Sequence, residues 1–133
     1  MQPAAQPEPE RVDSEAIARL LAEIADSKKA DDVMVLDMRS LVAYTDFLVV
    51  GTAQNERQAK AIRDDVHLRL KREHGLLPAN VEGESDAGWV LMDYLDAVLH
   101  VFVPELRERY RLDVLWSEAP RLELDLHALP DSA

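Results

Sequence analysis

The side chains that could do chemistry in this chain are mainly carboxylates and histidines, because the 133 residues include no cysteine. Thiolate nucleophiles and cysteine metal sites are therefore excluded. The serines follow no Gly-x-Ser-x-Gly pattern, and no glycine-rich phosphate loop is present. His67 and His74 lie on one expected helix, roughly 10 Å apart along its axis, which is too far to share a metal ion comfortably. His100 lies within an apolar strand, where a histidine is more often a hydrogen-bonded residue of the core or sheet face than a base.

Nucleotidyltransferase chemistry is the one enzymatic reaction with some support. A strand ending at residues 51–52, then a helix, then carboxylates further along the chain, is typical of those enzymes. They hold magnesium ions with paired carboxylates on one strand. Asp93 and Asp96 are separated by an expected turn and form no such pair. A metal-dependent nucleotidyltransferase-like enzyme using Asp93, Asp96 or Asp37 is therefore the alternative hypothesis, and the main expectation is a protein without catalysis, cofactor or metal.

A tryptophan beside carboxylates offers a binding chemistry instead. With a period of two, Trp89, Leu91 and Asp93 point to one face of an expected strand, and Val90, Met92 and Tyr94 point to the other. If the second set faces the core, the indole lies near a surface with carboxylates around it. Such a surface presents a large apolar anchor to a basic partner.

The elements that must position this strand follow from local patterns. The strand over residues 97–103 is apolar almost throughout, so we expect it in the centre of the sheet, covered on both sides. The strand after Pro78 is expected at an edge. A helical turn is expected over residues 113–116, with Leu112, Leu115 and Trp116 packing against the core. The pattern predicts helices over residues 14–29, 55–74 and from 104 onward, with strands over 33–38, 47–51, 79–82, 89–93 and 97–103.

This order predicts an α/β (α+β) three-layer sandwich, with a mixed sheet of about five strands flanked by helices. One domain is expected over residues 13–122, with a disordered leader over 1–12 and a tail over 123–133. No apolar run is long enough to cross a membrane, and the first ten residues do not form a secretory signal, so a soluble cytoplasmic protein is expected.

The charge of the chain is strongly negative, with a formal net charge of −11. Direct binding to nucleic acid is therefore not expected, because phosphate binding depends on Lys and Arg displacing counterions. An acidic surface suits a basic protein partner, although acidity also serves solubility alone.

Several motifs of the chain recur in a known order and spacing, namely residues 32–37, 44–47, 81–84, 88–94 with Asp96, 100–102 and 109–116. Together they closely resemble the ribosomal silencing factor family (RsfS, also called Iojap-like). The resemblance covers roughly residues 14–122.

The resemblance implies a nucleotidyltransferase-like fold without nucleotidyltransferase activity. It also implies binding to the large ribosomal subunit through that subunit's fourteenth protein, on the face that meets the small subunit. The bound factor would block subunit joining and repress translation in stationary phase, when nutrients are limiting. By similarity, the contact surface comprises Trp89, Leu91, Asp93 and Tyr94, with Glu82 and Glu84 as further contributors. Asp96 and His100 lie outside the strongest motif, and a structural role is the alternative to a contact for both.

A homo-oligomeric scaffold is a further hypothesis, with Trp89 buried where two copies meet. It does not exclude ribosome binding, because a homodimer could cover the same surface until it dissociates.

Overall fold

The computed structural model describes residues 13–83 and 88–126. The expected leader over residues 1–12, Glu84 and the last seven residues lie outside these ranges. The elements in chain order are α1 (Ser14–Ser27), β1 (Asp31–Asp37), β2 (Phe47–Thr52), α2 (Glu56–His74), β3 (Asn80–Glu82), β4 (Trp89–Asp93), β5 (Ala97–Phe102), α3 (Pro104–Arg109) and α4 (Leu112–Leu115).

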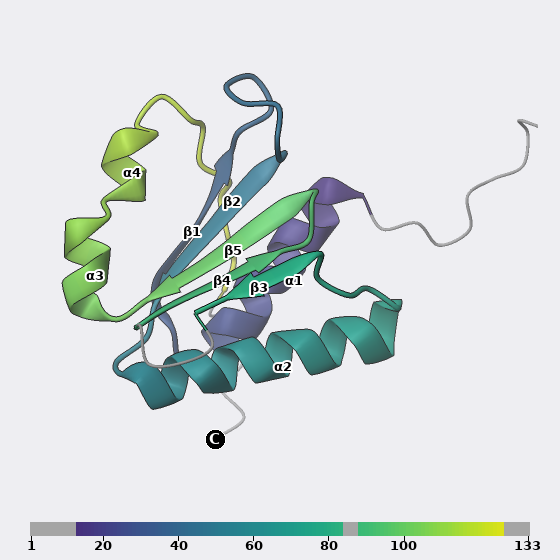
Figure 1. The fold of residues 1–133 in the computed structure, drawn as a ribbon. Coiled ribbons are helices and arrows are strands. Elements are labelled where there is room, and N and C mark those ends of the chain that lie inside the picture. The colour runs from purple at the N-terminus through teal and green to yellow at the C-terminus, as the bar shows by residue number, and fades with distance from the viewer. Residues whose placement is uncertain (1–12, 84–87, 127–133) are drawn as a thin grey trace, which may run out of the picture.

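The five strands form one mixed sheet in the order β1-β2-β5-β4-β3 (Figure 1). β2 pairs with β5 in parallel, and the other three pairings are antiparallel. The predicted α+β class with a mixed five-stranded sheet is confirmed. The apolar strand β5 is central and the short strand β3 lies at an edge, as their sequences predicted.

The larger core lies between the sheet and the two long helices, which lie together on one side of the sheet in Figure 1. α2 buries a single stripe of Ala59, Ile62, Val66 and Leu70 against it. This spacing of three and four residues leaves the charged side chains of α2 on its outer side. The sheet contributes alternate residues, because successive strand side chains point to opposite faces.

The opposite face of the sheet carries a second core, which α3, α4 and their connections cover in part. Leu106, Leu112 and Trp116 pack against buried strand residues there. This gives the three layers that were expected. Leu115 is 67% exposed, so its expected packing is wrong. A one-turn helix can bury one side only, and Leu112 and Trp116, four residues apart, occupy that side.

Arg107 attaches α3 to the strands beneath it. Its Nη1 donates to Thr52 Oγ1 at 2.7 Å, and its Nη2 donates to the Asp32 carbonyl at 3.1 Å. The Asp32 carboxylate lies 3.5 Å from the same nitrogen. α3 has no buried residue of its own, so these bonds and the packing of Leu106 fix its position.

An extended segment after α4 covers the outer edge of β1. Asp37 N donates to the Pro120 carbonyl at 2.8 Å, and Leu122 N donates to the Val35 carbonyl at 3.0 Å. Leu124 and Leu126 pack against the larger core. This pairing protects an edge strand whose backbone groups would otherwise be open to another chain. The expected domain boundary at residue 122 falls within this segment.

Candidate partner-binding surface

The outer row of β4 consists of alternate residues of one strand. Trp89, Leu91 and Asp93 are half-buried on the face that carries the second core, whereas Val90 and Met92 are buried on the other face. The predicted alternation is therefore confirmed. The indole is neither fully buried nor fully exposed, so one part of it packs while another remains accessible.

Glu82 extends this row across the sheet. The register of β3 and β4 places Glu82 opposite Leu91 and Asn80 opposite Asp93. Glu82 is exposed, and its Oε2 accepts a hydrogen bond from Asn80 Nδ2 at 2.8 Å. We call Glu82, Trp89, Leu91 and Asp93 the β4 surface, because the strand register brings these four side chains together.

Tyr94 lies on the other side of the sheet. Its side chain is 6% exposed within the larger core, and burial raises its pKa to about 12. Its hydroxyl has no hydrogen-bond partner among the described residues. The structure therefore does not bring the Tyr94 side chain to the β4 surface, and Glu84 lies outside the described residues.

The backbone that leads into β4 is closely packed. Gly83 and Gly88 both have positive φ, of 81° and 73°, which side chains rarely adopt. A Cβ on Gly83 would overlap the carbonyl of Trp89, and one on Gly88 would lie 2.9 Å from Val103 Cγ2. The glycines therefore allow the backbone to approach closely where the β4 surface begins.

An aromatic stack of two rings contacts the indole. Trp89 stacks on Phe102 and on Tyr110, with ring centroids 5.6 Å apart in both pairs. Phe102 faces Trp89 across the β4–β5 pair, and Tyr110 comes from the end of α3. Stacked aromatic pairs stabilise one arrangement by about 0.5–1.5 kcal/mol each beyond their buried area.

His100 completes the surroundings of the indole. Trp89 Nε1 donates to His100 Nδ1 at 3.2 Å, and the two rings lie nearly parallel, 6.0 Å apart with an interplanar angle of 16°. Burial lowers the pKa of His100 to about 4, although the nearby Asp93 carboxylate raises it in part. A neutral imidazole with an unprotonated Nδ1 is what an indole donor requires. The structural role that sequence allowed for His100 thus has a defined partner.

A sequence model of the family described as "Ribosomal silencing factor during starvation" matches residues 11–133. The chain belongs to the ribosomal silencing factor family. The resemblance seen in the sequence is thereby confirmed. A Bacillus subtilis protein named ribosomal silencing factor is 32% identical over 114 residues, which cover 86% of this chain and 96% of the relative.

The match covers nearly the whole length of some relatives and less than half the length of another. An Arabidopsis thaliana protein named chloroplastic protein Iojap is 33% identical over 112 residues, which cover 84% of this chain and 46% of that protein. A crystal structure from Chromobacterium violaceum superposes with a TM-score of 0.75, at 28% identity, over 91% of this chain and 99% of that one. A crystal structure from Bacillus halodurans superposes with a TM-score of 0.71 at 33% identity, over 83% of this chain and 99% of that one.

In this chain, two of the three carboxylates of the enzymatic alternative, Asp37 and Asp93, have structural partners. Asp37 accepts hydrogen bonds from Arg39 at 2.9 and 2.6 Å, and these bonds lower the pKa of Asp37. Asp93 Oδ1 accepts from the backbone N–H of Leu95 at 2.7 Å in the β4–β5 turn. Asp96 is exposed at that turn. Within residues 13–83 and 88–126, no group of three His, Cys, Asp or Glu side chains is placed to hold a metal ion.

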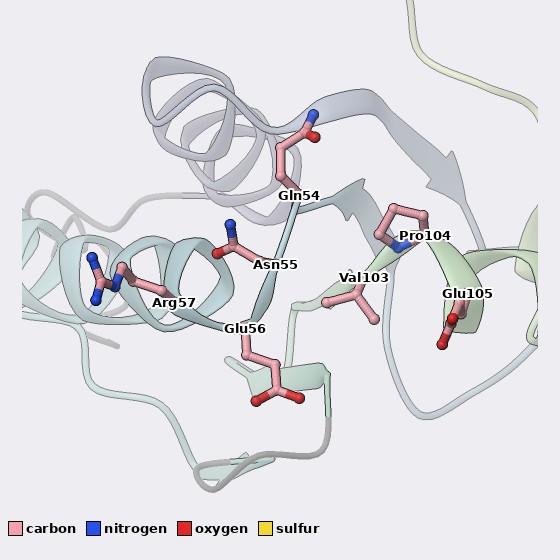
Figure 2. Close-up of a pocket in the computed structure, with 7 residues that line it drawn as sticks. All are labelled: Gln54, Asn55, Glu56, Arg57, Val103, Pro104 and Glu105. Atoms are coloured by element: carbon pink, nitrogen blue, oxygen red, sulfur yellow. The ribbon is translucent and has the colours of Figure 1, made fainter.

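An open hollow lies where α2 and α3 begin, lined by seven residues between Gln54 and Glu105 (Figure 2). None of the predicted site residues lines it. Backbone N–H groups at the start of α2 would attract a phosphate. Glu56 and Glu105 present carboxylates at the same place and would repel a phosphate.

Across the described part of the chain, no helix has the length and apolar character needed to span a membrane.

Proposed function

We propose that this chain represses translation by binding the large ribosomal subunit through its fourteenth protein and blocking the joining of the small subunit. The block is steric, so no covalent bond is made or broken. It acts in the cytoplasm, under nutrient limitation and in stationary phase. Membership of the silencing factor family and the β4 surface support the proposal.

The observation that carries the proposal is the half-buried indole beside carboxylates. Trp89 is held by a stack on Phe102 and Tyr110, and Asp93 and Glu82 lie on the same face of the sheet. Large aromatic anchors with one accessible side often dominate the energy of a protein interface. The acidic neighbours and the net charge of −11 would speed the approach of a basic ribosomal protein.

Replacing the anchor tests this assignment directly. We expect Trp89→Ala to weaken binding to isolated large subunits by about 2 kcal/mol or more, roughly thirtyfold, because the loss falls at the centre of the contact. The measurement is co-sedimentation of purified protein with large subunits over a range of concentrations. Tyr44→Ala is the matched control, because Tyr44 is a 62% exposed aromatic residue outside the β4 surface.

Undiminished binding by a folded Trp89→Ala protein would contradict the anchor role.

Sedimentation of the protein alone tests the homodimer alternative. If Trp89 lies where two copies meet, Trp89→Ala would convert a dimer into monomers without changing the affinity of the monomer for large subunits. Magnesium-dependent turnover of a nucleoside triphosphate would support the enzymatic alternative instead.

A further inference from the structure

We propose that His100 is the positioning residue of the β4 surface: it holds the indole of Trp89 in the single orientation that the partner recognises. This inference rests on the proposed function and names a residue on which that function depends. His100 would act through Trp89 and need not touch the partner itself.

The strand register places His100 for this task. His100 faces Leu91 in the β4–β5 pair. Trp89 lies two residues before Leu91 on β4, so the side chains of His100 and Trp89 lie on the same face of the sheet. The bond from Trp89 Nε1 to His100 Nδ1 therefore runs diagonally between the strands, at 3.2 Å. The two residues on either side of it on this face of β5, Val98 and Phe102, are apolar and buried. Among these three residues of β5, His100 alone can offer an acceptor to the indole.

The stack alone does not determine how the indole lies. A ring stacked on Phe102 and Tyr110 could turn over about its outer side-chain torsion, which is broad and roughly two-fold for tryptophan, and still stack. Turning over would move the N–H away from His100 and present a different edge of the ring to the partner. The indole nitrogen is a donor only, so a fixed acceptor selects one of the two orientations.

The surroundings of His100 keep that acceptor available. Burial lowers the pKa of His100 to about 4, and the opposing charge is Asp93 on β4. Tyr110 is the titratable group that packs against the indole from the end of α3. At neutral pH the imidazole is therefore uncharged, and the bond from the indole to Nδ1 requires its one ring proton to be on Nε2.

Three substitutions separate the hydrogen bond from the stack. His100→Asn keeps an acceptor close to the position of Nδ1 but loses the ring. His100→Phe keeps the ring but loses the acceptor. Trp89→Phe removes the donor and keeps an aromatic ring at the anchor. The combined Trp89→Phe, His100→Phe protein completes a double-mutant cycle that isolates the contribution of the bond.

The first measurement is the proton resonance of the Trp89 indole N–H by NMR, with Trp116 as an internal reference. We expect His100→Phe to shift the Trp89 signal and to increase its exchange with water, and His100→Asn to restore a hydrogen-bonded signal. An unchanged Trp89 signal in His100→Phe would overturn the proposal. This measurement does not depend on the ribosome.

The second measurement is affinity for large subunits. His100→Phe should weaken binding about fivefold, as the loss of one hydrogen bond typically does, while His100→Asn stays within about twofold of the unchanged protein. In the Trp89→Phe background, His100→Phe should have no further effect. An equal loss in both backgrounds, or full affinity in His100→Phe, would overturn the positioning role. If the unchanged protein does not bind large subunits, the proposed function fails, and the indole signal still decides whether His100 orients the ring.

Discussion

At the scale of single residues, Trp89 is held by its neighbours before any partner arrives. Phe102 and Tyr110 stack on its ring, and His100 accepts the hydrogen bond of its indole N–H. A side chain that is already ordered loses little conformational freedom when it binds, so more of its contact energy remains available for affinity. Under the proposed function, this arrangement would allow a half-buried tryptophan to serve as an anchor without being fully exposed.

The charge of Asp93 should matter for binding, separately from its role in the turn. Asp93→Asn removes the charge but keeps an oxygen that can accept from the Leu95 N–H. We expect binding to large subunits to weaken about threefold to tenfold at low salt, because a charge at the rim of an interface attracts a basic partner through water. Glu23→Gln is the matched control, since Glu23 is an exposed carboxylate on α1, across the sheet. Equal losses in both variants would show a general effect of net charge.

The buried histidine predicts how stability depends on pH. The pKa of His100 is about 4 in the folded chain, against an ordinary value of 6.5. Above pH 6.5 the residue is neutral in both states and causes no loss. As the pH falls from 6.5 to 4, the unfolded chain binds a proton that the folded chain does not, so the folded state loses up to about 3 kcal/mol.

Urea unfolding at several values between pH 7 and pH 4.5 measures this loss. His100→Asn carries no titrating group at this position and should show a flatter dependence over the same range. The carboxylate of Asp37, whose pKa is lowered, should affect both proteins alike and at lower pH. Parallel curves for the two proteins would contradict the assignment of the loss to His100.

At the scale of elements, the connection between α3 and the sheet determines where Tyr110 lies. Arg107 bridges β2 and the start of β1 through Thr52 and Asp32. Tyr110 follows α3 directly and stacks on Trp89. A change in the attachment of α3 should therefore reach the β4 surface.

Arg107→Lys tests this link. A lysine presents one nitrogen where arginine presents a planar fork, so it cannot reproduce both contacts at once. We expect a loss of about 1–2 kcal/mol in the free energy of unfolding and a weaker near-ultraviolet signal from the aromatic stack. Arg109→Lys, on the exposed side of the same helix, should change neither quantity. Equal effects of the two changes would show that the bridge does not hold α3.

The sequence predicted most elements because each has a local signal. Asn55 accepts from Gln58 N at 2.9 Å as an N-cap, and Gly75 ends α2 in the left-handed conformation; asparagine and glycine are residue types that favour these two positions. The alternation in β4 likewise needed only a period of two. Such features depend on neighbours in the sequence.

The supports of Trp89 were harder to predict because they depend on distant contacts. The stack with Tyr110 requires the path of α3, which Arg107 fixes through a partner 55 residues away. The bond to His100 could have been predicted from the sequence, because the two-residue connection between Tyr94 and Ala97 determines the strand register. That register places Leu91 opposite His100 and brings the imidazole near the indole.

At the scale of the whole molecule, the two faces of the sheet have different coverings. α1 and α2 cover one face, whereas α3 and α4 cover only part of the other (Figure 1). On that second face Trp89, Leu91 and Asp93 of the β4 surface remain half-buried. Under the proposed function, a three-layer domain bound through this part of the sheet would place its helices and the rest of the sheet in the space around the contact. It would then obstruct a second large particle without a conformational change.

The most direct test is to mix separated small and large ribosomal subunits with this protein and to measure the joined particles by sedimentation. The account predicts that the joined fraction falls as the protein saturates the large subunit, and that Trp89→Ala restores joining at the same protein concentration. An unchanged joined fraction, with the protein bound to every large subunit, would contradict it.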